Sequence, residues 1–132
     1  MQTAPSSASG GCLCGEVRFR VNGPLRDVFI CHCAVCRRQS THVGAYTACA
    51  PNHFILEKAE TLRWYQSSPA ARRGFCSACG SQLLWEPNSG DQLSIAAGCL
   101  DSTVGLTVRQ HIFVAEKAPY YEITDGYPQR PD

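Results

Sequence analysis

Seven of the nine cysteines of this chain fall into three tight clusters. The clusters are Cys12-x-Cys14, Cys31-x-Cys33-x-x-Cys36 and Cys76-x-x-Cys79. A closed zinc site takes four thiolates, so seven sulfurs supply one complete tetrahedral site and a second site with one position to spare. A thiol bound at that position would lose its proton and become a nucleophile. We therefore look for chemistry at the site that has three ligands.

The spacing suggests how the seven sulfurs divide. The middle cluster already supplies three sulfurs within six residues, so the economical division pairs the first cluster with the last. It assigns a structural zinc to Cys12, Cys14, Cys76 and Cys79, and an open, catalytic zinc to Cys31, Cys33 and Cys36. The competing division joins Cys31 and Cys33 to the last pair and leaves Cys36 with the first, and the sequence does not exclude it.

Local geometry supports metal binding by each pair. Residues Cys12 and Cys14 on an extended segment place both sulfurs on one face, because alternate side chains point the same way. The segment Cys76-Ser-Ala-Cys79-Gly80 suits a tight turn whose backbone N–H groups point at the sulfurs. Without a recognisable secretory signal, such cysteines are expected to serve metal or catalysis rather than disulfides.

The other reactive residues give weaker signals. Cys49 and Cys99 lie in apolar stretches and are expected to be buried free thiols, although Cys99 could be a fourth ligand of the open zinc. His32 points away from the metal on an extended segment, and His111 reads as a hydrogen-bonded strand histidine.

Two pairs of arginines are candidates for recognition of carboxylates. Arg37 and Arg38 directly follow a zinc ligand, so they are our candidates for binding the carboxylates of a thiol cofactor. The second pair, Arg72 and Arg73, is expected at the surface.

Length and charge narrow the class of protein. The 132 residues suit one domain, and the net charge of +1 offers no field that would steer a nucleic acid. The N-terminal residues lack the pattern of a signal peptide, and no apolar run reaches membrane-spanning length. We expect a cytoplasmic protein with small-molecule substrates and no nucleic-acid or membrane partner; a homodimer is compatible with the sequence.

Short alternating segments separated by Gly, Pro, Asn and Ser predict a mainly β domain. Strands are expected within 12–21, 27–31, 43–48, 54–56, 62–65, 83–85, 93–97, 107–114 and 119–123, with one helical turn at 34–39. Residues 1–9 are expected to form a disordered tail, 10–127 the zinc-binding domain, and 128–132 a loose C-terminal tail.

An ordered series of motifs resembles the glutathione-dependent formaldehyde-activating family, which shares its domain with centromere protein V. The series is Gly10-Gly-Cys-Leu-Cys-Gly-Glu-Val-Arg-Phe19, Cys31-His-Cys-Ala-Val-Cys-Arg-Arg-Gln-Ser40, Arg73-Gly-Phe-Cys-Ser-Ala-Cys-Gly-Ser81, Ala97-Gly-Cys-Leu-Asp101 and His111-Ile-Phe-Val-Ala-Glu-Lys-Ala-Pro119. The chain departs from many relatives at Thr41, where they have Gly, and near Pro119-Tyr-Tyr121, where they often have Trp.

The resemblance implies an Mss4-like fold of several coiled antiparallel β-sheets around zinc sites. It implies the same two zinc sites that the ligand count suggests, with the zinc of Cys31, Cys33 and Cys36 catalytic. The implied activity is a carbon–sulfur lyase reaction that condenses glutathione with formaldehyde to S-(hydroxymethyl)glutathione.

Two other functions are compatible with the same residues. In a zinc-stabilised binding module, both metals would be structural and the surface would recognise a partner. Thiol redox chemistry at Cys76 and Cys79 ranks last, because a redox pair normally avoids a closed metal site.

Overall fold

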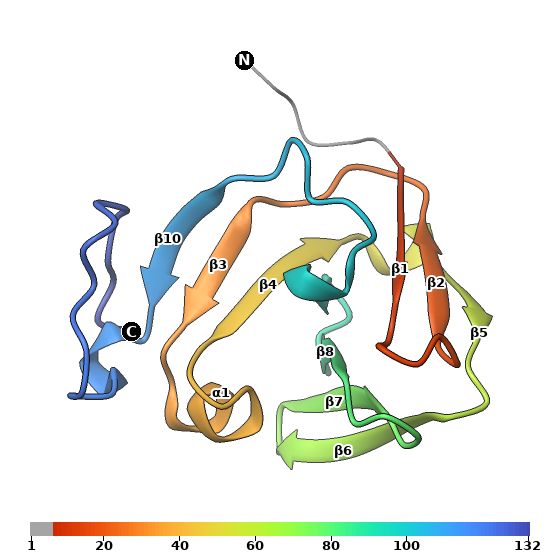
Figure 1. The fold of residues 1–132 in the computed structure, drawn as a ribbon, viewed down its shortest axis with the longest axis horizontal. Coiled ribbons are helices and arrows are strands. Elements are labelled where there is room, and N and C mark those ends of the chain that lie inside the picture. Colours follow the sequence, from red (N-terminus) through yellow and green to blue (C-terminus); the bar gives the residue numbers. More distant parts are fainter. Residues whose placement is uncertain (1–6) are drawn as a thin grey trace.

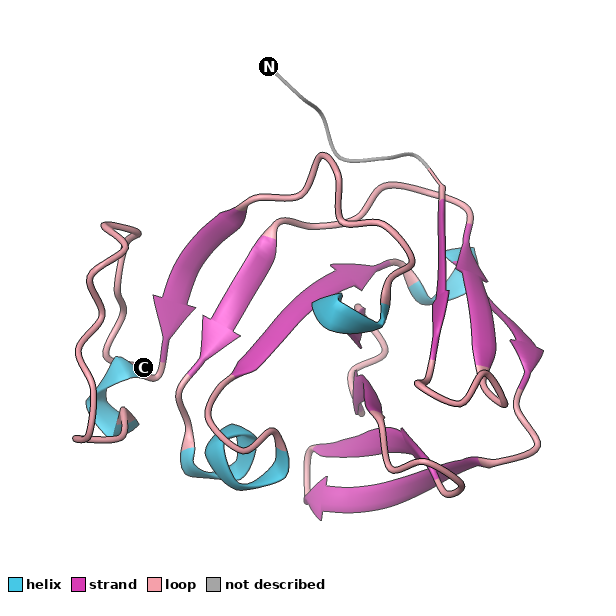
Figure 2. Cartoon of the chain, in the orientation of Figure 1, coloured by secondary structure: helices cyan, strands magenta, loops and turns pink. Residues whose placement is uncertain are grey.

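The computed structural model describes residues 7–132, and β-strands dominate its regular structure (Figures 1 and 2). The strands are β1 (Ala8–Gly11), β2 (Arg18–Val21), β3 (Val28–Cys31), β4 (Gly44–Cys49), β5 (Phe54–Lys58), β6 (Leu62–Ser68), β7 (Ala71–Cys76), β8 (Gln82–Pro87), β9 (Leu93–Ala96) and β10 (Val108–Ile112). The helical elements are α1 (Ala34–Gln39) and the 3-10 turns η1 (Pro51–His53), η2 (Ala97–Cys99) and η3 (Val114–Glu116). The predicted mainly β fold is confirmed.

The strands form two sheets of unequal size. The smaller sheet has the order β1-β2-β5, and the larger has the order β10-β3-β4-β9-β8-β7-β6. Neighbouring strands are antiparallel except β10 and β3, which run parallel. A parallel pair requires a crossover connection, and here the crossover contains every strand from β4 to β9. The described helices include none that is long and apolar enough to cross a membrane.

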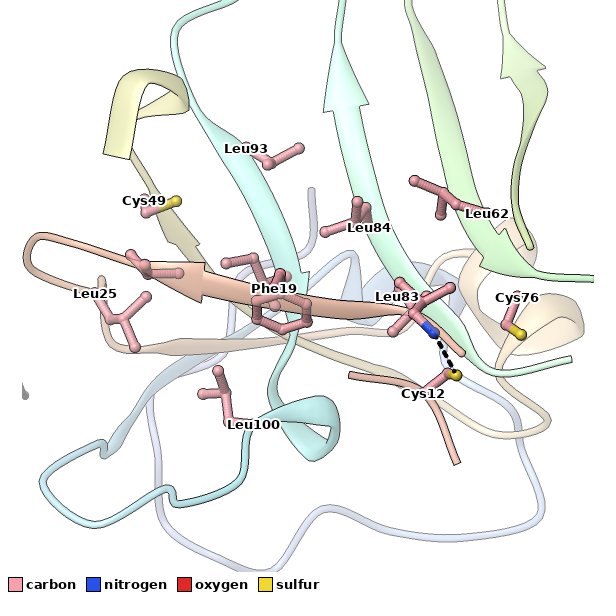
Figure 3. Packing of buried hydrophobic residues seen from close by; sticks show 13 residues of the cluster. Cys12, Phe19, Leu25, Cys49, Leu62, Cys76, Leu83, Leu84, Leu93 and Leu100 are labelled. Carbon is pink, nitrogen blue, oxygen red and sulfur yellow. Dashed lines mark hydrogen bonds between the residues drawn. The ribbon is translucent and has the colours of Figure 1, made fainter. Parts of the chain in front are cut away.

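The core lies between the two sheets. Val17, Phe19 and Val21 are completely buried on one face of the β2 segment. They belong to the same buried cluster as Leu83 of β8 and Ile95 of β9 (Figure 3). Each such side chain contributes about 1.5–3 kcal/mol by leaving water. The alternation in the sequence therefore marks the face that joins the small sheet to the large one.

Strand β7 and the 119–123 segment differ from expectation. No strand was predicted at β7, because Gly74 is a poor strand former and Arg72 and Arg73 interrupt any alternation of apolar and polar residues. Pairing with β6 on one side and β8 on the other overrides that local preference. Residues 119–123, expected as a strand, have no strand partner and follow an irregular path.

Strand pairing and backbone hydrogen bonds reach into the described parts of both predicted tails. Of the predicted 1–9 tail, residues 1–6 lie outside the described part of the chain, whereas Ala8 and Ser9 begin β1 and pair with β2. The predicted 128–132 tail lies alongside β10 and η3, where the Arg130 N–H donates to the His111 carbonyl at 2.9 Å. Figure 1 shows this segment folded back beside β10. Backbone hydrogen bonding, which composition does not reveal, holds both segments.

A close backbone approach at Gly10 gives a test of the packing between β1 and η2. A Cβ at Gly10 would lie 2.3 Å from the Cys99 carbonyl oxygen and 2.6 Å from the Phe19 ring. We expect Gly10→Ala to lower the free energy of unfolding by about 1–3 kcal/mol, because the core cannot absorb the methyl group without shifting. Urea denaturation measures the change. Gly98→Ala is the matched control, since its Cβ would meet no atom within 4 Å; equal losses in both variants would contradict this packing.

Candidate metal centres and the adjoining cavity

The first group of sulfurs joins two turns that are distant in sequence. Cys12 and Cys14 lie in the turn between β1 and β2, whereas Cys76 ends β7 and Cys79 lies in the turn that leads to β8. The Cys14 sulfur lies 3.6 Å from that of Cys12 and 3.8 Å from that of Cys76. Cys12 and Cys76 also border the hydrophobic core (Figure 3). The group therefore fastens the small sheet to the large one.

Hydrogen bonds surround the sulfurs of this group, and they favour the thiolate forms of Cys76 and Cys79. The Val17 N–H donates to the Cys12 sulfur at 3.2 Å, and the Cys79 N–H donates to the Cys76 sulfur at 3.4 Å. The pKa of Cys79 is lowered to about 5, mainly by a hydrogen bond with the Ser81 side chain and next by one with the Ser81 backbone. The Thr61 hydroxyl, 3.3 Å from the Cys76 sulfur, lowers the pKa of Cys76.

The second group is built where β3 passes into α1. Cys31 ends β3, Cys33 is the N-cap residue of α1, and Cys36 lies on the buried side of the helix. The cap is formed by sulfur, because the Cys36 N–H donates to the Cys33 Sγ at 3.3 Å. The thiols of Cys31 and Cys36 donate to the same sulfur and lower the pKa of Cys33. Cys33 is therefore the member of the group most disposed to be ionised.

The arrangement of both groups fits zinc. A tetrahedron with Zn–S bonds of about 2.3 Å has sulfur–sulfur edges of about 3.8 Å. In each group all ligand atoms lie within 4.8 Å of one another, and the groups comprise four and three cysteines, respectively. The structure thus gathers the sulfurs as the economical division has them. Thiolate donors at these separations are typical of zinc sites.

A cavity of about 470 Å³ adjoins the three-cysteine group but not the four-cysteine group. Cys31, Cys33 and Cys36 contribute to its lining. The walls include aromatic and aliphatic side chains from four strands or loops, namely Phe29, Trp85, Ile112 and Phe113. Its size is within the range of small-molecule sites, which are mostly apolar with a few placed polar groups.

The arginines on this cavity are not those that the sequence favoured. Arg37 and Arg38 occupy the last turn of α1, and neither lines the cavity. Arg73, expected at the surface, is buried and lines the cavity, as does Arg26. Strand alternation explains the difference, because Arg72 and Arg73 point to opposite sides of β7. That signal was in the sequence, but it required recognising β7 as a strand.

Tyr46 adds a buried hydroxyl to the same wall of the cavity. Its side chain packs with Cys31 and Cys36 and is 8% exposed. Burial raises the pKa of Tyr46, so its hydroxyl keeps its proton at neutral pH. The cavity thus holds a proton-bearing group beside the sulfurs.

A chain of hydrogen bonds supports the loop behind the second group. His32, between two of the cysteines, lies with its Nε2 2.8 Å from the His111 Nδ1. The His111 Nε2 in turn lies 2.8 Å from the Asp125 Oδ2, and the Tyr121 hydroxyl lies 3.0 Å from the His32 Nδ1. A carboxylate only accepts, so His111 donates to Asp125, His32 donates to His111, and Tyr121 donates to His32.

This chain of hydrogen bonds fixes the His32 and His111 rings and holds the C-terminal segment against β3. Burial, reinforced by the neighbouring His111, lowers the pKa of His32, so this ring stays neutral as the hydrogen-bond order requires. The sequence indicated that His32 points away from the metal and that His111 is satisfied by hydrogen bonds. It did not indicate Tyr121 and Asp125, which come from the irregular 119–128 segment.

The remaining cysteines lie outside both groups. Burial raises the pKa of Cys49 and of Cys99 to about 11, so both remain protonated. The Cys99 thiol donates to the Gln82 carbonyl at 3.2 Å. It is therefore engaged away from the three-cysteine group.

Thr41, where many relatives are expected to have Gly, follows α1 with a left-handed φ of 67°. Glycine adopts this conformation without the steric cost that a β-branched residue incurs. The departure at Thr41 therefore concerns the backbone after the helix, and no sulfur of either group.

The sequence is similar to those of a known protein family and its members. A family model described as glutathione-dependent formaldehyde-activating enzyme matches residues 7–116. A Halomonas elongata protein, whose name assigns it to glutathione-dependent formaldehyde activation, is 30% identical over 138 residues, with 90% of this chain and 87% of the relative covered. A Schizosaccharomyces pombe protein named as an uncharacterized lyase is 24% identical over 117 residues, with 88% and 85% covered.

A crystal structure of a Rhodobacter sphaeroides protein has a similar fold. Its TM-score is 0.63 at 23% sequence identity, and the match covers 76% of this chain and 97% of that one. The likeness supports the mainly β architecture alone.

The two sulfur groups should differ in what they contribute to stability. We expect purified protein to bind two equivalents of zinc, and Cys76→Ser and Cys36→Ser to lose one equivalent each. Cys76→Ser should lower the melting temperature far more, because its group joins the two sheets and metal binding there contributes directly to folding. Elemental analysis and thermal denaturation measure both quantities. A larger loss of stability in Cys36→Ser would contradict this division of roles.

Removing the Tyr121 hydroxyl tests the hydrogen-bond chain. We expect Tyr121→Phe to lower the free energy of unfolding by about 1–3 kcal/mol, because the buried Nδ1 of His32 loses its donor. Chemical denaturation measures the change. Tyr127→Phe, at a tyrosine that is 40% exposed, should change it by less than about 0.5 kcal/mol. If the two variants are equally stable, the chain of hydrogen bonds does not support the fold.

Proposed function

Because the chain belongs to the family of glutathione-dependent formaldehyde-activating enzymes, we propose that it is a zinc-dependent carbon–sulfur lyase. It forms or cleaves thiol–aldehyde adducts such as S-(hydroxymethyl)glutathione. The observation that carries the proposal is the position of the cavity, which adjoins the group of three cysteines and not the group of four. A site that only stabilises the fold has no need of such a space.

The four-cysteine group serves folding in this proposal, with zinc held by Cys12, Cys14, Cys76 and Cys79. Zinc held by Cys31, Cys33 and Cys36 would keep one coordination position for the sulfur of a thiol substrate and would favour its deprotonated form. The apolar side chains of Phe29, Trp85 and Phe113 line the cavity around that position. Bringing the sulfur and the aldehyde carbon together in such a space supplies much of the rate gain, since it makes their encounter effectively intramolecular.

Glutathione is the thiol that the family description favours. The cavity of about 470 Å³ has room for more than formaldehyde alone. We retain Arg37 and Arg38 as candidates for the carboxylates of a thiol that extends out of the cavity. Both occupy the last turn of the helix that carries Cys36.

The alternative of a zinc-stabilised binding module receives less support. A purely structural second site would have a fourth protein ligand and no adjoining cavity. Among residues 7–132, the metal-ligating group around Cys31 contains three cysteines only, and it opens on the cavity.

Substitution of one ligand tests the proposal. We expect Cys33→Ser to lose one equivalent of zinc and to slow adduct formation from glutathione and formaldehyde by more than about 100-fold. Loss of a residue that merely supports a metal ligand already costs about 10- to 100-fold. Exchange NMR with labelled formaldehyde measures the enzyme-catalysed rate above the spontaneous reaction.

Cys99→Ser is the matched control, because a serine hydroxyl can keep the hydrogen bond to the Gln82 carbonyl. It should retain both zinc equivalents and the wild-type rate. The mechanism is wrong if Cys33→Ser retains its zinc content and its rate of adduct formation.

A further inference from the structure

Arg73 is a buried charge without an acidic partner. Its exposure is 5%, although it lines the cavity. None of the ion pairs found within residues 7–132 includes it. Burying a charge is strongly unfavourable unless it is paired and hydrogen-bonded. The groups around Arg73, or a ligand in the cavity, must supply the compensation.

Three contacts hold its guanidinium in place. Nη2 donates to the Cys36 sulfur at 3.6 Å, and Nη1 donates to the Tyr46 hydroxyl oxygen at 3.4 Å. Nε donates to the Ser67 hydroxyl at 3.3 Å. An arginine has five N–H donors, so two of them lack a protein partner among the described residues. The side chain is thus fixed, yet it still has donors to offer.

Its neighbour in sequence shows what an arginine does on the other face of the same strand. Arg72 pairs with Glu86 at 2.7 Å and lies over the Trp64 ring at 3.9 Å. Its charge is compensated at the partly exposed surface. The charge of Arg73 has no carboxylate partner among the described residues: it contacts the Cys36 sulfur and two hydroxyl groups, and it lines the cavity.

If Arg73 served only to offset the negative charge of the cysteine sulfurs, its contact with Cys36 would be sufficient. Arg73 and Tyr46 line the same cavity as the three cysteines, where a substrate sulfur would lie. Hydrogen bonds between a guanidinium and an anionic oxygen are about twice as strong as neutral ones. Donors fixed in advance in a space that excludes water stabilise developing charge most effectively.

We propose that Arg73 and Tyr46 form an anion subsite of the cavity, which takes the oxygen that becomes negatively charged as a thiol adds to an aldehyde. This inference rests on the proposed lyase function. A lone pair of the substrate sulfur forms the new C–S bond, and the π electron pair of the C=O bond moves onto oxygen. That oxygen then takes up the proton that the thiol released, and the reverse steps return thiol and aldehyde.

A stable thiol with an anionic oxygen can probe the subsite without turnover. Mercaptoacetate carries a carboxylate close to its sulfur, and 2-mercaptoethanol carries a neutral hydroxyl at the same distance along the chain. With the sulfur of each at the three-cysteine group, only mercaptoacetate would place a negative oxygen beside Arg73. The ratio of the two dissociation constants therefore isolates the anion subsite from binding of the sulfur.

Isothermal titration calorimetry with both thiols tests the proposal. The zinc-loaded proteins to be compared are the wild type and the variants Arg73→Met, Arg73→Lys, Tyr46→Phe and Arg72→Met. We expect Arg73→Met to weaken the binding of mercaptoacetate by about tenfold or more and the binding of 2-mercaptoethanol by less than about twofold. Arg73→Lys should recover part of the preference, because it keeps the charge but not the forked donors. Arg72→Met, the matched surface control, should equal wild type.

Each result bears on the subsite separately from the reaction. Equal weakening of both thiols in Arg73→Met, or no weakening of either, overturns the proposal, because Arg73 would then act on the sulfurs or on the fold alone. Should Arg73→Met lose zinc, Tyr46→Phe decides by the same comparison: its preference for mercaptoacetate over 2-mercaptoethanol must be smaller than that of the wild type.

Adduct formation, measured by exchange NMR, separates the two claims. A wild-type protein that prefers mercaptoacetate but forms no adduct contradicts the proposed function and leaves the subsite standing. A zinc-loaded Arg73→Met that forms adducts at the wild-type rate contradicts the subsite and leaves the function standing.

Discussion

The meeting of four sulfurs from two distant turns is the constraint on which the rest of the structure depends. Cys14 and Cys76 are 62 residues apart in the chain, yet their sulfurs lie 3.8 Å from each other. Closing so long a loop restricts the unfolded chain, and a metal ion bound there would add directly to folding. The contact also sets how the small sheet lies on the large one, with Val17 and Phe19 buried between them.

The second group of sulfurs takes no part in joining the two sheets. Its three cysteines come from one short stretch at the end of β3, so they need no distant segment to bring them together. What distant segments supply is the surroundings. The larger sheet contributes Tyr46, Arg73 and Trp85 to the cavity wall, and each comes from a different strand.

The back of the second site depends on the C-terminal segment. Tyr121 and Asp125 enclose the His32–His111 pair at both ends, and the last residues continue along β10 (Figure 1). The loop that carries the three cysteines is therefore held on one side by strand pairing and on the other by buried polar contacts. Such support keeps ligating side chains oriented, as partners outside a metal site generally do.

The sequence by itself determined the three cysteine clusters and the mainly β character, whereas the division of the seven sulfurs into groups of four and three came from the structure. Tight cysteine spacing and two-residue alternation are local properties, so Cys31, Cys33 and Cys36, or Val17 and Phe19, can be recognised without coordinates. Tertiary structure alone decided what lies opposite them. Arg73 is buried because β6 and β8 enclose β7, and residues 128–132 are ordered because β10 offers a free edge. Pairing between segments far apart in the chain overrides the weak strand preference of glycine, and no local pattern records it.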